Sequence, residues 1–120
     1  MTLKTIVMKN QKLNRQQFAY KCVIDNKNKD FKNAVEKAGM IILKNGLISA
    51  LANIKANEKK LYKCISEWLK KENFPLGFDN NEDLLKNLLA CDSQTLLVLT
   101  EEVLLLTDAL KEFCKAELKD

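Results

Sequence analysis

Glycine and proline are unusually scarce in this chain of 120 residues, which contains three Gly and one Pro. Folds built from many short strands need a turn about every ten residues, and Gly and Pro are the residues that most often make such turns. No segment alternates apolar and polar residues over the length of a strand. The sequence therefore predicts an all-α fold in which a few loops join long helices.

Apolar residues recur at spacings of three and four along the chain, which is the period of one helix face. The pattern predicts helices beginning near residues 11–14, after Asp30, after Gly46, after Asn57, after Asn81, and at Asp92 or Ser93. Asp and Asn side chains at such positions commonly cap a helix N-terminus. A polar segment over residues 73–81, which holds the proline, is expected to be a linker.

The last predicted helix carries the longest apolar seam. Its members are Leu96, Leu99, Val103, Leu106, Leu110 and Phe113. We expect a compact bundle of about five to six helices with this helix as its core. Residues 1–10 are expected to form a flexible N-terminal tail, and residues 11–120 a single α-helical domain.

Several classes of site have no counterpart in the sequence. The chain lacks His, the commonest general base and metal ligand, and its four cysteines form no C-x-x-C pair. It has no glycine-rich phosphate-binding loop. We expect no catalytic residues, no metal and no cofactor, and hence a protein that is not an enzyme.

The hydrophobic segments are too short for a membrane span of about 20 residues, and the N-terminal segment does not have the apolar core of a signal peptide. The sequence predicts a cytoplasmic protein without membrane contact. Cys22, Cys64 and Cys114 fall among apolar residues at helical spacing and are expected to be buried, reduced thiols.

Charge is distributed unevenly along the chain. Residues 1–73 hold 16 Lys and Arg against 6 Asp and Glu, a net charge of +10, whereas residues 74–120 hold 4 against 10, a net charge of −6. Such an asymmetry indicates either a polyanion bound by the basic half or self-association through opposite charges. A compositional drift of the surface is the alternative.

Arg15 is the only arginine, and it lies within the apolar sector of its predicted helix. Its planar guanidinium could hold a phosphate, or it could form an ion pair with an acidic residue of the last helix. Lys12 precedes it by one turn, and Lys37 and Lys44 share a face of the next helix. Together with Asn45, these residues are the candidate phosphate contacts.

A second candidate surface lies on the last helix, away from the core seam. Val98 and Leu105 are seven residues apart and lie beside Glu101, Asp108 and Glu112. If these apolar residues are exposed, they mark a protein interface; the alternative is a thick core that reaches this face. Contact between the acidic half of one copy and the basic half of the next would give a head-to-tail stack.

Five stretches resemble the small helical subunit of type III-B CRISPR effector (Cmr) complexes. They are residues 15–23 (RQQFAYKCV), 40–52 (MIILKNGLISALA), 61–69 (LYKCISEWL), 100–106 (TEEVLLL) and 113–118 (FCKAEL). Their order and spacing extend the resemblance over residues 11–118.

The resemblance implies a non-catalytic subunit of which several copies stack as a minor filament in an antiviral RNA-guided complex. It also implies contacts with the guide RNA and target RNA and with other subunits of the complex. The small subunit of a type III-A complex and a helical adaptor that binds only protein are the alternatives.

Overall fold

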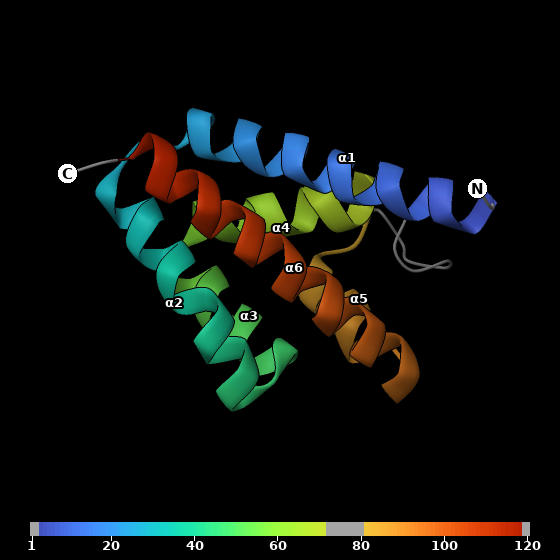
Figure 1. Ribbon diagram of the computed structural model, residues 1–120. Helices are drawn as coiled ribbons and strands as arrows, with labels where there is room; N and C mark the ends of the chain where they lie inside the picture. The colour runs from blue at the N-terminus through green and yellow to red at the C-terminus, as the bar shows by residue number, and fades with distance from the viewer. Residues whose placement is uncertain (1–2, 72–80, 119–120) are drawn as a thin grey trace.

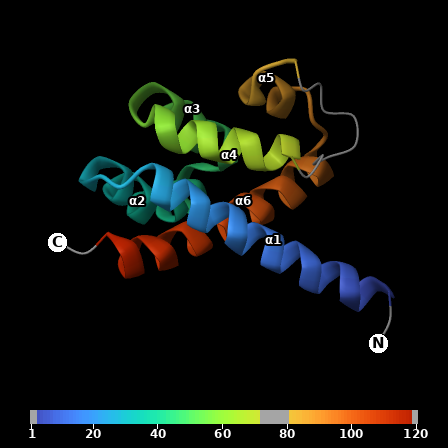
Figure 2. The ribbon, with the colours of Figure 1, turned by 90° about the horizontal axis from the view of Figure 1, so that it is seen from above.

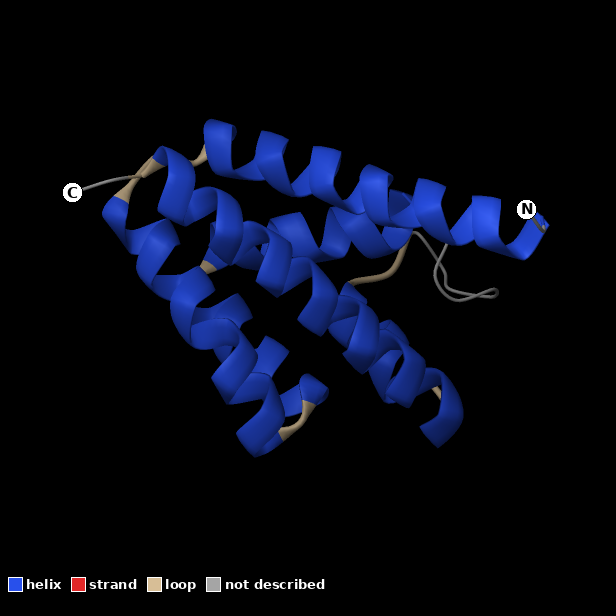
Figure 3. Cartoon of the chain, in the orientation of Figure 1, coloured by secondary structure: helices blue, strands red, loops and turns tan. Residues whose placement is uncertain are grey.

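The computed structural model describes residues 3–71 and 81–118 of the chain. Within these ranges it contains helices and no strand (Figure 3), so the all-α prediction is confirmed. The helices are α1 (Leu3–Asp25), α2 (Lys29–Asn45), α3 (Leu47–Asn57), α4 (Lys59–Lys71), α5 (Leu84–Leu89) and α6 (Ser93–Glu117). None of these helices is both long and apolar enough to cross a bilayer.

The long helix α6 is central to the bundle, as its apolar seam predicts. It packs against α1 and α2, while α3 lies between α2 and α4 and also contacts α5. In Figure 1, α1 runs along the top and α2 and α6 approach each other at one end and diverge at the other. The view from above shows α1 crossing α6, and α3, α4 and α5 lie together in the upper part of that view (Figure 2).

The first helix begins earlier than the sequence predicts. Its apolar pattern suggested a start near residues 11–14, whereas α1 begins at Leu3. Most of the segment assigned to the N-terminal tail is therefore part of α1. The linker predicted for residues 73–81 lies, apart from Asn81, outside the described residues.

The predicted helix caps are only partly correct. Asp92 caps α6, where its side chain accepts from the amide of Thr95. Asn28 rather than Asp30 caps α2, and Asp83 rather than Asn81 caps α5. The predicted cap Asn57 is instead the last residue of α3. Several Asn and Asp residues precede α2 and α5, and the apolar pattern does not distinguish among them.

Gly46 joins α2 to α3 within a single residue. Its φ of 84° lies in the region that side chains disfavour, and its amide donates to the carbonyl of Ile42. This connection lets two helices follow one another without a loop, and the second begins after Gly46, as predicted.

The core forms where the apolar faces of the helices meet. Its largest fully buried side chains include Trp68 of α4, Leu51 of α3, and Leu99, Leu106 and Leu110 of α6. Burying each such side chain contributes about 1.5–3 kcal/mol. Three thiols were predicted to be buried and reduced. The structure confirms this, because Cys22, Cys64 and Cys114 are buried and form no disulfide.

A charged group also lies inside this core. Arg15 of α1 and Glu102 of α6 are 9% and 7% exposed, and they form a bidentate ion pair. Arg15 Nε lies 2.8 Å from Glu102 Oε1, and Arg15 Nη2 lies 3.0 Å from Oε2. The indole N–H of Trp68 donates to the same Oε1 at 2.8 Å. One carboxylate therefore links three helices, α1, α4 and α6.

We predict that Glu102→Leu lowers the free energy of unfolding by about 3–5 kcal/mol, because it leaves the Arg15 charge buried without a partner. The double variant Arg15→Leu/Glu102→Leu should lose less free energy of unfolding than Glu102→Leu alone, since it leaves no unpaired charge in the core. Urea denaturation of both single variants and the double variant measures this coupling. Strictly additive losses would contradict a direct interaction between the two side chains.

Candidate functional site

The sequence left two roles open for Arg15, phosphate binding and an ion pair within the bundle, and the structure shows the ion pair. Its guanidinium is directed into the bundle and is engaged by the carboxylate of Glu102, an acidic residue of the last helix. A phosphate at this position would have to displace a buried partner that already makes two charge-assisted hydrogen bonds. Arg15 is therefore not part of the surfaces considered below.

The remaining predicted phosphate contacts are exposed but are divided between two helices. Lys12 lies on α1, whereas Lys37 and Lys44 lie on the outward face of α2 and Asn45 is the last residue of that helix. Lys37 and Lys44 share one face, as their spacing predicts. Lys12 is not on that face.

The candidate protein interface lies on the solvent side of α6. Val98 and Leu105 are 57% and 48% exposed, which excludes the thick core proposed as the alternative. Glu101, Asp108 and Glu112 are exposed on the same side. We call Val98, Glu101, Leu105, Asp108 and Glu112 the acidic stripe of α6.

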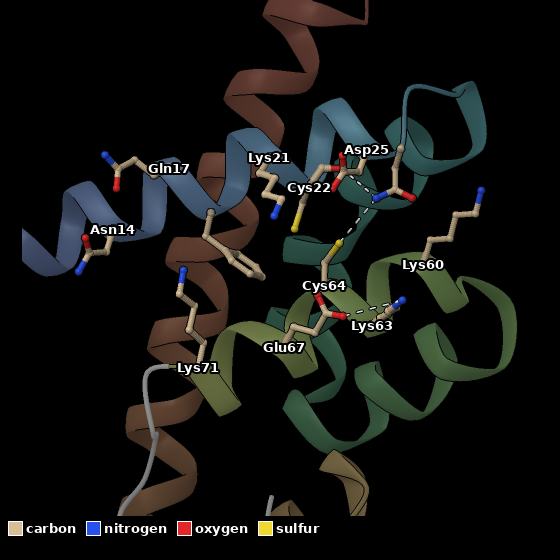
Figure 4. A pocket seen from close by; sticks show the side chains of 12 residues that line it. Asn14, Gln17, Lys21, Cys22, Asp25, Lys60, Lys63, Cys64, Glu67 and Lys71 are labelled. Carbon is tan, nitrogen blue, oxygen red and sulfur yellow. Dashed lines mark hydrogen bonds and ion pairs between the residues drawn. The ribbon is translucent and has the colours of Figure 1, made fainter.

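A concave site lies elsewhere, between α1 and α4 (Figure 4). It is a groove with a volume of about 890 Å³. Four lysines line it, Lys21 from α1 and Lys60, Lys63 and Lys71 from α4. The other lining residues are Asn14, Gln17, Phe18, Cys22, Asp25, Asn26, Cys64 and Glu67. None of the predicted phosphate contacts lines this groove.

The groove carries a net positive charge, because its four lysines outnumber Asp25 and Glu67. One acid is partly neutralised, since Lys63 Nζ lies 3.9 Å from Glu67 Oε1. Exposed ion pairs of this kind are weak and can be exchanged for other partners. The lysine side chains thus remain available for an anion that enters the groove.

An aromatic ring lies at one end of the groove. The Phe18 ring packs against Trp68 with its centroid 5.2 Å away, and Lys71 Nζ lies 5.7 Å from the Phe18 centroid. Phe18 is half-buried. Its packing holds the ring in place, so the cation above it is positioned by a rigid surface.

Two cysteines form the floor of the groove, one from each wall. The Cys22 thiol donates a hydrogen bond to Cys64, and this bond together with burial raises the pKa of Cys22. The same bond lowers the pKa of Cys64. The amide of Asn26 donates to the carbonyl of Cys22 and approaches Cys64 Sγ at 3.9 Å. Cys22 stays protonated at neutral pH, so the lysines above the floor dominate the charge of the groove.

This arrangement can bind an extended anion but supplies no metal-binding cluster. Among the described residues, no group of three or more His, Cys, Asp or Glu side chains could hold a metal ion. Flexible lysines and side-chain amides on two facing helices can contact anionic groups without demanding one fixed geometry.

Residue-by-residue reading of the sequence missed these groove lysines. Lys60, Lys63 and Lys71 lie on the polar side of α4, where lysines usually serve only to solvate the helix. The one available signal was collective, because all four belong to the basic half of the chain. The groove itself depends on how α1 lies against α4.

A family model described as CRISPR-associated protein (Cas_Cmr5) matches residues 11–117. The match covers nearly all of the described structure, including both groove walls and the acidic stripe of α6. No curated protein matches the chain.

Proposed function

The chain belongs to the small-subunit family of type III-B CRISPR (Cmr) complexes, and on this basis we propose that it is a non-catalytic subunit that holds RNA within such a complex. In this role it contacts the sugar-phosphate backbone of the guide RNA and target RNA in the cytoplasm, as part of antiviral defence. Its other partners are the remaining subunits of the complex and further copies of itself.

The groove between α1 and α4 is the observation that carries the RNA-binding part of the proposal. In an RNA-guided complex, base pairing reads the sequence, and the protein needs only to recognise backbone and shape. A lysine-lined groove with amide donors meets that need without any base-specific contact. The exposed lysines of α2 are the second candidate surface for RNA.

The non-catalytic part of the proposal is supported by the full sequence. The chain has no His, and hence no imidazole to activate a hydroxyl or thiol. The carboxylates of the acidic stripe are spread along one exposed helix face rather than gathered in a pocket.

Self-association is the third part of the proposal. The acidic stripe of α6 offers exposed apolar side chains rimmed by carboxylates, a composition that suits contact with a basic protein surface. We infer that neighbouring copies or other subunits cover this stripe during head-to-tail stacking in the complex.

We predict that Lys21→Glu/Lys60→Glu, one reversal on each groove wall, weakens retention of target RNA by the assembled complex at least about tenfold. The slope of log affinity against log salt should fall by about 1 for each lost phosphate contact. Filter binding of labelled target RNA over a salt series measures both effects.

Lys37→Glu/Lys44→Glu is the matched control, because it makes the same charge change outside the groove. If the groove alone holds RNA, this variant leaves RNA affinity nearly unchanged in complexes that contain the normal amount of the subunit. If only this control loses RNA affinity, α2 rather than the groove binds RNA. Unchanged binding by both double variants would favour an adaptor that binds only protein.

We also predict that Leu105→Glu reduces incorporation of the chain into the complex, because it replaces an apolar side chain of the contact with a charge that must be desolvated. Leu89→Glu on α5 is the control, since Leu89 is also exposed but lies outside the acidic stripe. Co-purification with a tagged neighbouring subunit measures incorporation. Equal incorporation of the two variants would remove the acidic stripe from the assembly interface.

A further inference from the structure

The outward side of α2 exposes two large apolar side chains between lysines. Met40 and Leu43 are 74% and 76% exposed. Lys37, Met40 and Lys44 lie in one row because residues three, four and seven apart share a helix face. The ion pairs among the described residues involve neither of these lysines. Exposed apolar residues rimmed by one sign of charge indicate a protein contact rather than a bare RNA surface.

The acidic stripe of α6 repeats this row with opposite charge. Leu105 lies between Glu101 and Asp108, which are seven residues apart, as are Lys37 and Lys44. Seven residues of α-helix span about 10.5 Å, so two lysines on one helix can meet two carboxylates on the other at the same time.

We propose that α2 of one copy of this chain packs antiparallel against the acidic stripe of α6 in a second copy. In this direction Lys37 faces Asp108, Lys44 faces Glu101, and Met40 falls directly opposite Leu105. The same register brings the exposed amide of Asn33 to Glu112. In the parallel direction Met40 and Leu105 would be one residue out of step.

The position of α2 within one chain makes this contact a closed pair. Gly39 packs against α6, where a methyl group added to it would lie 3.9 Å from Thr107 Oγ1, and α2 and α6 lie side by side there (Figure 1). The buried residues of both helices point to the same core. Both outward faces therefore lie on the same side of the molecule.

A twofold axis along this side places α2 of each copy over α6 of the other. A rotation about this axis leaves the position of every residue along the axis unchanged. Residue 39 of one copy therefore lies opposite residue 107 of its partner, and residue 37 lies opposite residue 109. This register is within one residue, or about 1.5 Å, of the register that the charges select. The contact is then made twice and closes, because the same patch serves both copies.

The pair uses the acidic stripe that we propose for stacking in the complex, and to that extent it rests on the proposed function. A stripe covered by a second copy is unavailable to neighbouring subunits. The closed pair is therefore a storage form of the free chain that must open before incorporation.

Reversing the charges tests the pair. Sedimentation equilibrium of the free chain should give a dimer and no larger species. Lys37→Glu/Lys44→Glu and Glu101→Lys/Asp108→Lys should each weaken pairing at least tenfold, because like charges then face one another at both contacts. An equimolar mixture of the two variants should recover the dimer, since every contact again joins opposite charges.

All four substituted residues are exposed, and circular dichroism verifies that the variants fold. Met40→Asp is an independent variant that should weaken pairing with a single change. The proposal is overturned if the wild-type chain is monomeric at its highest soluble concentration, if it grows beyond a dimer, or if the mixture fails to recover the pair. These outcomes and the RNA test are distinguishable, because the RNA test changes groove residues and reads its Lys37→Glu/Lys44→Glu control in assembled complexes.

Discussion

The buried ion pair between Arg15 and Glu102 is the interaction on which the arrangement of this bundle depends. A carboxylate in an apolar core is tolerated only when its oxygens are engaged, and here Arg15 and Trp68 engage them from two different helices. Apolar burial is non-directional and does not by itself require one side-chain geometry. A bidentate pair with one additional N–H donor does require one, so it fixes α1 and α4 relative to α6.

Fixing these helices also fixes the groove, because α1 and α4 are its two walls. Phe18 packs on Trp68, and Trp68 donates to Glu102, so the end of the groove is continuous with the buried network. The chain thus uses its one arginine inside the core and presents lysines to solvent. Lysine is suited to this role, since it contacts phosphate as a flexible point charge without demanding a fixed geometry.

Periodicity predicted the helices and the core well, because the amphipathic stripes of α2, α4 and α6 are unambiguous. The caps were harder, since Asn28 and Asp30 are equally suitable in composition and only the path of the backbone distinguishes them. Arg15 was recognised as unusual, but its partner lies 87 residues away and becomes visible only in the fold. The groove lysines were missed for the same reason, because two separate polar faces become one site only when the helices pack.

We propose above that the groove between α1 and α4 holds the RNA backbone. The most direct measurement is a map of RNA–protein crosslinks on this chain within the native complex, read by mass spectrometry. If RNA lies in the groove, the crosslinked peptides contain Lys21, Lys60, Lys63 and Lys71. Crosslinks that avoid these lysines and gather on Lys12, Lys37 and Lys44 would contradict the proposal.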